Sequence, residues 1–296
     1  MLSSVPLVTS IPPQISRQAT DGTEIGREYA LACIRSWRTS GFHPVTVNAE
    51  GEGVPEWASS EEIGRLTVKR NAREQFGRPL VYLHDLIAAA RSLTEGPVVV
   101  VNSDILLEMN SAMQQRISNI RPGECLISRR TDIHDLDCRV GQEYARGFDF
   151  FACHSHDLAE YANHDFVFGM PWWDHYFPIH LFLGGLKSLP AAQPFAFHLA
   201  HEEAWERSSW FMLGNRFLDA VRSETLKNGE NAPLAIDYAR RRERALLGSD
   251  ASLTTRTAIR LRNLTEGGRT RNGIDAFHRM SALNMAWLDE VKSRVG

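Results

Sequence analysis

Four consecutive valines, Val98-Val99-Val100-Val101, are the feature of this 296-residue chain that most restricts its fold. A continuous β-branched run without polar alternation predicts a strand covered on both faces, at the centre of a mostly parallel sheet. The tripeptide Asn102-Ser103-Asp104 follows the run directly. In open α/β sheets, ligands bind beyond the carboxyl ends of the strands, so this polar tripeptide marks the place where we expect a binding site.

The first half of the chain alternates strand-like and helix-like segments, as βαβ units do. We expect strands at residues 5–10, 44–48, 65–69, 98–101, 124–128 and 148–153, and helices at 24–39, 80–93, 111–118 and 157–162. Aromatic residues, Gly and Pro from 169 to about 195 predict loops, and the pattern from 209 onward is helical apart from a turn near Gly267-Gly268. The sequence therefore predicts an α/β domain at 1–210, with a Rossmann-type, mostly parallel central sheet flanked by helices, and a helical C-terminal extension at 211–296.

Composition argues against several classes of protein. A net charge of −3 without a dominant basic run argues against a chain that neutralises nucleic-acid phosphates, so we expect no nucleic-acid partner. The cluster Arg240-Arg241-Arg242 is followed by Glu243 and is typical of a solvated helix face. The four cysteines show no CxxC pairing, which indicates neither a disulfide scaffold nor a structural zinc site.

The same sequence predicts a cytoplasmic location. Residues 1–13 lack the charged and apolar regions of a signal peptide, and no stretch of 18 apolar residues occurs. We therefore expect no transmembrane segment, which leaves room for peripheral contact with a membrane. The unpaired cysteines fit a reducing compartment.

Asp104 is the first candidate for chemistry. A carboxylate at the tip of a central strand can hold Mg²⁺ or Mn²⁺ together with the phosphate oxygens of a substrate. Alternatively, Asp104 caps the turn or helix that follows the strand.

The aromatic segment around Trp172-Trp173-Asp174 is the second candidate. Indole rings offer a face on which a sugar can stack, and a carboxylate between them can act as a general base toward a hydroxyl. Desolvation by the rings would raise the pKa of Asp174 toward a useful value. Alternatively, the segment is a buried aromatic corner in which Asp174 holds backbone amides.

His198 and His201 form the third candidate. They are three positions apart, so the two imidazoles share one face if the segment is helical and can then bind a metal together. A single imidazole that completes a cation site made of carboxylate and phosphate is an alternative, and a structural role is another.

Two weaker groups are expected near the same edge of the sheet. Thr9, Ser10 and Ile11 end the first strand, where hydroxyls and backbone groups can hold a nucleotide base or ribose. Arg70 and Asp85 follow the third strand, where a cation can meet a diphosphate. Both groups also have an ordinary explanation as surface residues.

The order of these features resembles a GT-A type, nucleotide-sugar-dependent glycosyltransferase over about residues 5–210. The shared features are an N-terminal βαβ region, a DxD-like acidic strand end, an aromatic segment with an acid, and a late histidine. The resemblance implies a GT-A-like catalytic domain and a saccharide or glycolipid acceptor, as in polysaccharide assembly. Asn102 stands where the first Asp of the motif usually stands, which removes a negative charge and predicts weaker or dispensable metal binding.

The resemblance also implies roles for particular residues. Asp104 corresponds to the metal-binding Asp of the motif, and His198 to the late histidine of the metal shell, with His201 as the substitute. Asn102, Ser103 and Asp149 would then line the donor site. Trp172 and Trp173 would line the acceptor site.

This resemblance implies a mechanism in which Mn²⁺ or Mg²⁺ neutralises the leaving nucleoside diphosphate. Asp174 would deprotonate the acceptor hydroxyl for in-line attack with inversion, and retention follows if Asp174 only orients the acceptor. Two rival functions remain: a sugar-phosphate nucleotidyltransferase, against which the non-glycine loop after the first strand argues, and a binding protein that has lost catalysis.

Overall fold

The computed structural model describes residues 4–191, 194–201, 207–227, 232–247 and 271–295. The chain forms two compact units. The first comprises Met1–Gly169 and Ser188–Glu203, and the second comprises Met170–Lys187 and Ala204–Gly296. The sequence-based domain boundary at 210 stays a prediction. The expected turn near Gly267-Gly268 lies outside the described residues.

The larger of the two sheets has seven strands in the order β10-β6-β9-β4-β1-β2-β3. Its strands are β1 (Val5–Thr9), β2 (Phe42–Ala49), β3 (Gly64–Val68), β4 (Pro97–Val101), β6 (Glu124–Ser128), β9 (Phe150–His154) and β10 (Lys187–Ser188). The neighbours β3, β2, β1 and β4 are parallel, and β9 is antiparallel to both β4 and β6. The predicted fold class, α/β with a mostly parallel central sheet, is therefore confirmed.

The valine run occupies the centre of this sheet, as predicted. Val98, Val99, Val100 and Val101 in β4 are all buried. Val99 and Val101 belong to a core that also contains residues of α1 (Gly26–Thr39) and α4 (Ser111–Ser118). Successive side chains point to opposite faces, and α3 (Leu83–Ser92) contacts β1, β3 and β4. The β-branched side chains thus fill both layers between sheet and helices.

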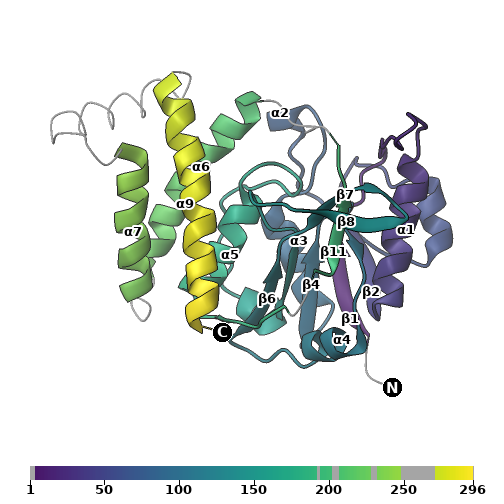
Figure 1. The fold of residues 1–296 in the computed structure, drawn as a ribbon, viewed down its shortest axis with the longest axis horizontal. Helices are drawn as coiled ribbons and strands as arrows, with labels where there is room; N and C mark the ends of the chain where they lie inside the picture. The colour runs from purple at the N-terminus through teal and green to yellow at the C-terminus, as the bar shows by residue number, and fades with distance from the viewer. Residues whose placement is uncertain (1–3, 192–193, 202–206, 228–231, 248–270, 296) are drawn as a thin grey trace. The chain divides into compact units, whose positions relative to one another are not determined.

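The spacing of the buried residues in α1 explains why this segment is helical. Its buried residues include Tyr29, Cys33 and Trp37, which are spaced by four residues and share one face. Helix α1 packs against β2 (Figure 1) and against β5 (Leu106–Leu107). Short helical segments lie between the strands at η1 (Glu56–Glu61), α2 (Arg73–Phe76) and η2 (Ser155–Leu158).

A second, four-stranded sheet has the order β5-β11-β7-β8. Its further strands are β7 (Thr131–Asp135), β8 (Cys138–Glu143) and β11 (Ala196–Leu199). β5 follows the tripeptide directly and pairs antiparallel with β11, which in turn pairs parallel with β7. This small sheet brings segments that are far apart in sequence to the end of β4.

The second unit is helical. It contains α5 (Trp173–Leu183), α6 (Arg207–Lys227), α7 (Ala232–Leu247) and α9 (Arg271–Val295). Helices α7 and α9 run side by side (Figure 1), with Tyr238 stacked edge-on against Trp287 and the Arg241 guanidinium 2.5 Å from Glu290 Oε2. Arg241 and its two neighbouring arginines therefore lie on a partly solvated helix face.

Three local expectations differ from the structure. The sequence predicts loops at 169–195, but this segment contains α5. Helix α5 is buried on nearly every side, so its sequence lacks the amphipathic periodicity that predicts a helix. The helix also contains a proline, Pro178, a residue that usually breaks helices. Residues 157–162 were expected as a helix and form only the end of η2. The hairpin of β7 and β8 was not predicted, because β8 is mostly exposed and has no apolar alternation.

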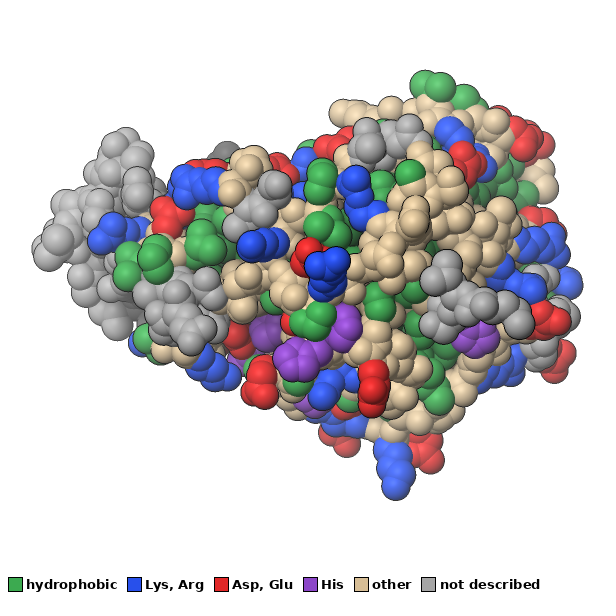
Figure 2. All heavy atoms as spheres, turned by 90° about the horizontal axis from the view of Figure 1, so that it is seen from below, with side chains coloured by type: hydrophobic (Ala, Val, Ile, Leu, Met, Phe, Trp, Pro, Cys, Tyr) green, Lys and Arg blue, Asp and Glu red, His purple; other side chains and the backbone are tan. Residues whose placement is uncertain are grey.

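Acidic and basic side chains are interspersed on the face of the molecule in Figure 2, without one sign dominating a large area. Among the described helices, none is both long and apolar enough to cross a bilayer.

Candidate functional site

The candidate site lies where the strand order of the larger sheet reverses. From β1 the chain moves outward to β2 and β3, and it then returns to β4 on the other side of β1. Such a switch point leaves a crevice beyond the carboxyl ends of the two central strands, and ligands of open α/β sheets bind there. The residues after β1 and the tripeptide after β4 both begin at this edge.

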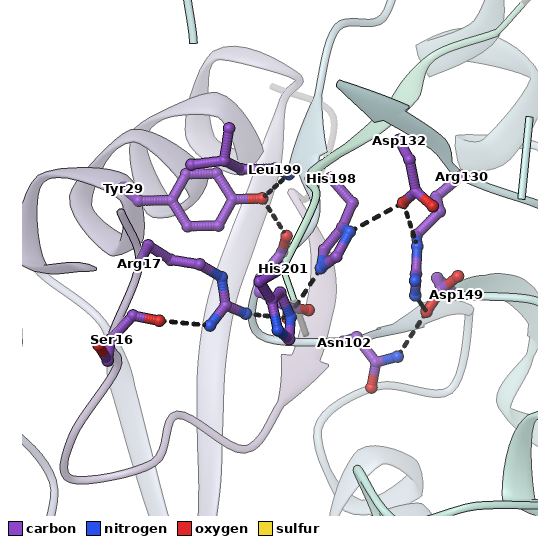
Figure 3. Close-up of polar contacts among 11 residues, drawn as sticks. Ser16, Arg17, Tyr29, Asn102, Arg130, Asp132, Asp149, His198, Leu199 and His201 are labelled. Atoms are coloured by element: carbon purple, nitrogen blue, oxygen red, sulfur yellow. Dashed lines mark hydrogen bonds and ion pairs between the residues drawn. The ribbon is translucent and has the colours of Figure 1, made fainter. Parts of the chain in front are cut away.

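Asp104 contacts the side chains of Arg17, His198 and His201, whose arrangement Figure 3 shows. Its Oδ2 is 2.6 Å from Arg17 Nη2, 3.4 Å from His198 Nε2 and 3.7 Å from His201 Nε2. One ligand atom from each of Asp104, His198 and His201 lies within 4.8 Å of the others. The structure thus brings together all three residues for which the sequence predicted a metal-binding role.

Secondary structure, and not a shared helix face, places the two histidines. His198 lies in β11, which pairs with the strand that follows Asp104, whereas His201 lies just beyond the end of β11. Their ring centroids are 4.9 Å apart. The helical spacing considered for this segment is therefore wrong, although the two rings do meet.

Tyr29 ties the two sides of the cluster together. Its hydroxyl donates to the Asp104 carbonyl oxygen at 2.5 Å and accepts from the Leu199 backbone N–H at 2.8 Å. The phenol of α1 thereby holds the end of β4 against the strand that carries His198. Burial raises the pKa of Tyr29 well above its usual range, so the hydroxyl keeps its proton.

A second row of charged groups lies behind His198. His198 Nδ1 is 2.9 Å from Asp132 Oδ1, which also accepts from Arg130 Nε at 2.8 Å. Arg130 Nη1 donates to Asp149 Oδ1 at 3.0 Å. Because an ionised carboxylate only accepts, Asp132 assigns the proton to Nδ1 and turns Nε2 of His198 toward Asp104.

The same row of charged groups also contacts the tripeptide at residues 102–104, through Asp149. Asn102 Nδ2 donates to Asp149 Oδ1 at 2.6 Å, and the Asn102 backbone N–H donates to the Asp149 carbonyl oxygen. Asp149 is 3% exposed. An aspartate at position 102 would face this buried carboxylate with a second negative charge, so the network favours an amide at this position.

The electrostatics of the cluster favour a charged carboxylate. Burial by itself would raise the pKa of Asp104, but the charge of His198, hydrogen bonds from His198 and His201 and the charge of Arg17 hold that pKa well below its usual range. Burial would lower the pKa of His198, yet the charge of Asp104 and hydrogen bonds to Asp104 and Asp132 raise it. The Asp104 carboxylate is thus ionised near neutral pH.

Polar groups at the end of β1 already form hydrogen bonds within the protein. The Ile11 backbone N–H donates to Thr46 Oγ1, and the Ile11 carbonyl accepts from Asn48 Nδ2, both at 2.9 Å. Thr9 is fully buried, whereas Ser10 is half-buried. Of the three residues at this strand end that the sequence predicts to bind the nucleotide-sugar donor, Ser10 is the one whose side chain reaches the surface. Ser103 is half-buried between Asn102 and Asp104.

Arg70 and Asp85 belong to a separate ion-pair cluster at the start of α3. Arg70 Nε is 2.8 Å from Asp85 Oδ2, Nη1 is 2.8 Å from Asp165 Oδ1, and the guanidinium stacks over the Tyr82 ring. Their predicted role in donor binding stays a prediction.

Trp172, Trp173 and Asp174 belong to the helical unit. Both indoles are 2% exposed, and Trp172 packs against Trp210, Phe217 and Phe277. Trp172 also has a φ of 77°, which is rare for a bulky residue, and its Nε1 donates to the Trp210 carbonyl oxygen. Asp174 lies in the first turn of α5 and is half-buried. The roles predicted for these residues in acceptor binding and as base stay predictions.

The donor set of Asp104, His198 and His201 fits a divalent first-row transition cation. Mg²⁺ prefers oxygen ligands in octahedral geometry, whereas imidazole suits transition cations, and the buried carboxylate supplies negative charge. Two imidazoles and one carboxylate fill only part of a coordination shell, which leaves positions for phosphate oxygens or water. The two imidazoles therefore favour a transition cation over Mg²⁺.

No protein-family model matches this sequence, and no curated relative matches it. Solved structures with a similar fold include a nucleotidyl transferase from Methanothermobacter thermautotroptrophicus (14% identity; 73% of this chain and 99% of the other; TM-score 0.41). Another is HddC from Yersinia pseudotuberculosis in complex with GMP-PN (9%; 72% and 99%; TM-score 0.34). A third is the mannosyltransferase PcManGT from Pyrobaculum calidifontis in complex with GDP-Man and Mn²⁺ (11%; 98% and 86%; TM-score 0.38). At TM-scores below 0.5, these likenesses do not bear on the activity of this chain.

Four residues of the cluster escaped the sequence analysis: Arg17, Tyr29, Arg130 and Asp132. Arg17 and Asp104 are separated by 87 positions, and nothing local in the sequence connects them. Arg130 and Asp132 had a usable signal, because they alternate with buried Thr131 and Ile133 as the residues of a strand do.

Proposed function

We propose that this protein is a glycosyltransferase that moves a sugar from a nucleoside diphosphate donor to a hydroxyl acceptor with the help of a divalent cation. The observation that carries the proposal is the cluster of Asp104, His198 and His201 at the switch point of the sheet. A cation site in that crevice is suited to ligands that bring a diphosphate.

The residues around the site have definite tasks in this proposal. Asp104, His198 and His201 would hold the cation, which when bound supplies positive charge to the diphosphate leaving group. The side-chain Nδ2 of Asn102 donates to Asp149. The side-chain oxygen of Asn102 can accept a hydrogen bond from a ribose hydroxyl. Ser10 is half-buried at the end of β1 and would contact the nucleoside.

Asp174 is the proposed base toward the acceptor hydroxyl. It lies in the first turn of α5, is half-buried, and directly follows the buried Trp172 and Trp173. Transfer would proceed with inversion if Asp174 removes the proton during attack. The acceptor class proposed is a saccharide or a glycolipid, which follows from the resemblance of the sequence to GT-A enzymes.

The deciding experiment is a donor screen. Calorimetry with UDP, GDP and their sugars, with and without Mn²⁺, should give binding that strengthens when Mn²⁺ is present, and slow hydrolysis of one nucleotide sugar should release a nucleoside diphosphate. Failure to bind any nucleotide under these conditions would remove the proposal. Release of pyrophosphate from a nucleoside triphosphate would show a nucleotidyltransferase instead.

A variant pair then tests the two proposed roles, cation binding by Asp104 and base catalysis by Asp174. Asp104→Asn should weaken Mn²⁺-dependent donor binding, whereas Asp174→Asn should leave donor binding intact and abolish transfer. Asp219→Asn, an exposed acid of α6, is the matched control and should change neither. Loss of donor binding in Asp174→Asn would show that this residue does not act on the acceptor.

A further inference from the structure

Arg17 is the charged side chain closest to the Asp104 carboxylate. It lies in the loop between β1 and α1, its side chain is 11% exposed, and its Nη2 is 2.6 Å from Asp104 Oδ2. Nη1 donates to the Ser16 carbonyl oxygen, and Nε is buried without a hydrogen-bond partner among the described residues. The guanidinium therefore uses only part of its donor capacity (Figure 3).

The oxygen that Arg17 contacts is also the one nearest both histidines. His198 Nε2 and His201 Nε2 are closest to Oδ2 of Asp104, at 3.4 and 3.7 Å. A divalent cation bound by these three groups would lie about 2 Å from Oδ2. It would then come within a few ångströms of the guanidinium, where the two positive charges repel each other in a poorly solvated place. Arg17 and the cation thus compete for one oxygen.

The backbone around Arg17 is held by hydrogen bonds, so we expect only the side chain of Arg17 to move when a cation binds. Glu24 accepts from the Arg17 backbone N–H at 2.9 Å, from Ser16 Oγ at 2.6 Å and from the Gly26 backbone N–H at 2.8 Å. A Cβ on Gly26 would lie 1.9 Å from the Ile15 carbonyl oxygen, so the loop lies directly against the start of α1. The flexible stem of Arg17 can rotate while its Cα stays in place.

We propose that Arg17 is an exchange residue: it neutralises Asp104 until a cation binds there, and it then turns to the phosphate oxygens of the ligand that the cation holds. This inference rests on the proposed function for the identity of the ligand as a nucleoside diphosphate sugar. Its chemistry requires only a cation and a diphosphate group.

Two physical facts direct the released guanidinium to phosphate. The planar fork of Arg matches two oxygens of a phosphate group, and such charge-assisted hydrogen bonds are about twice as strong as neutral ones. The loop of Arg17 also starts at the switch-point edge of β1, beside the end of β4. A diphosphate at the Asp104 cluster would lie within reach of that side chain.

The proposal predicts effects of opposite sign for one substitution. In Arg17→Gln, Mn²⁺ alone should bind about fivefold more tightly, the size expected for losing one competing ion pair. Inorganic pyrophosphate in saturating Mn²⁺ should bind about tenfold more weakly, because a charge-assisted contact is lost. A merely structural role for Arg17 would weaken both.

Two further variants make the test specific. Arg17→Lys keeps the charge but not the fork, so Mn²⁺ affinity should stay near that of the parent chain while pyrophosphate binds more weakly. Arg27→Gln removes an exposed charge from the first turn of α1 and should change neither affinity. Isothermal titration calorimetry measures both ligands, and circular dichroism melting verifies that each variant is folded.

The outcomes separate this inference from the proposed function. If Mn²⁺ affinity is unchanged or weaker in Arg17→Gln, or if no chain binds Mn²⁺, the exchange is overturned. If the Mn²⁺ and pyrophosphate results are as expected but no nucleotide sugar binds, the exchange stands and the proposed function fails.

Discussion

Asn102 donates its side-chain N–H to the buried carboxylate of Asp149, so an acid at position 102 would bring two carboxylates together. We expect Asn102→Asp to lower the free energy of unfolding at neutral pH by about 2 kcal/mol, because a hydrogen bond becomes a repulsion between poorly solvated charges. Denaturant unfolding monitored by circular dichroism measures the change.

The control for this prediction is the same substitution at Asn110. Its side chain accepts from the Met113 backbone N–H at the start of α4, a position where Asp serves as well as Asn. Asn110→Asp should therefore keep the stability of the parent chain. Equal stability of both variants would show that Asn102 and Asp149 do not form the pair described.

Asp132 orients His198 by accepting a hydrogen bond from its Nδ1–H. Partners of this kind set the orientation and basicity of a ligating imidazole, so Asp132→Asn should weaken Mn²⁺ binding by about tenfold. Asp135→Asn, on an exposed residue of the same strand, should leave Mn²⁺ affinity unchanged. Calorimetric titration of Mn²⁺ into the three chains tests this, and an unchanged affinity in Asp132→Asn would remove its positioning role.

Glu52 provides a test of pH dependence away from the metal cluster. Burial raises its pKa, although hydrogen bonds from the Ala49 backbone N–H and the Asn48 side chain act the other way. A carboxyl with a raised folded-state pKa favours folding at low pH and loses that contribution as the pH rises through this pKa.

Glu52→Gln should therefore raise the thermal midpoint at about pH 7.5, and the gain should shrink toward about pH 4, where the carboxyl is protonated. Differential scanning fluorimetry across this range measures the effect. Glu50→Gln removes an exposed charge from the same turn and serves as the control. A gain that does not depend on pH would contradict the assignment.

At the scale of elements, the pairing of β7 with β8 holds Asp132 in position. Gly141 lies opposite Ile133 in this ladder, and a Cβ at Gly141 would be 2.0 Å from the Asp132 carbonyl oxygen. Gly141→Ala should therefore push the strands apart and lower the free energy of unfolding by about 2 kcal/mol, with weaker Mn²⁺ binding.

Gly53→Ala is the matched control, because its Cβ would meet only Pro13 Cβ at 3.7 Å, an ordinary contact. Denaturant unfolding measures the stability of both variants, and titration with Mn²⁺ measures their affinity for the cation. Normal stability and normal Mn²⁺ affinity in Gly141→Ala would mean that the hairpin does not support the site.

Elements differed in how well their sequence predicted them. The core of β4 was predicted from Val98 to Val101 because burial on both faces selects for an unbroken β-branched run. Helix α5 was missed because burial on every side removes the periodicity that identifies a helix. Strand β8 was missed for the opposite reason, since its exposed residues obey no apolar pattern.

At the scale of the whole molecule, the two compact units allow ligand effects to be localised. The proposed cation ligands all lie in the first unit. We expect Mn²⁺ to slow amide hydrogen exchange in the segment after β4 and in β7 and β11, because binding restricts local opening there.

Hydrogen exchange measured by mass spectrometry tests this expectation on the full chain, with Ca²⁺ as a comparison cation because Ca²⁺ prefers oxygen ligands. Slower exchange confined to α6, α7 and α9 would contradict the placement of the metal site.

The sequence by itself determined the buried central strand, the alternation of strands and helices, and the polar tripeptide at the strand end. These features are local: hydrophobic periodicity and β-branching act over a few residues and can be read from them. The sequence also singled out Asp104, His198 and His201 as separate candidates.

Only the tertiary structure decided that these three side chains meet, because their meeting depends on the pairing of β5 with β11 across some 90 residues. It also added Arg17, Tyr29 and Asp132, whose contacts with the cluster span 66 positions or more. Charge and hydrogen-bond partners at such separations are fixed by strand register and helix packing, which no local pattern of residues encodes.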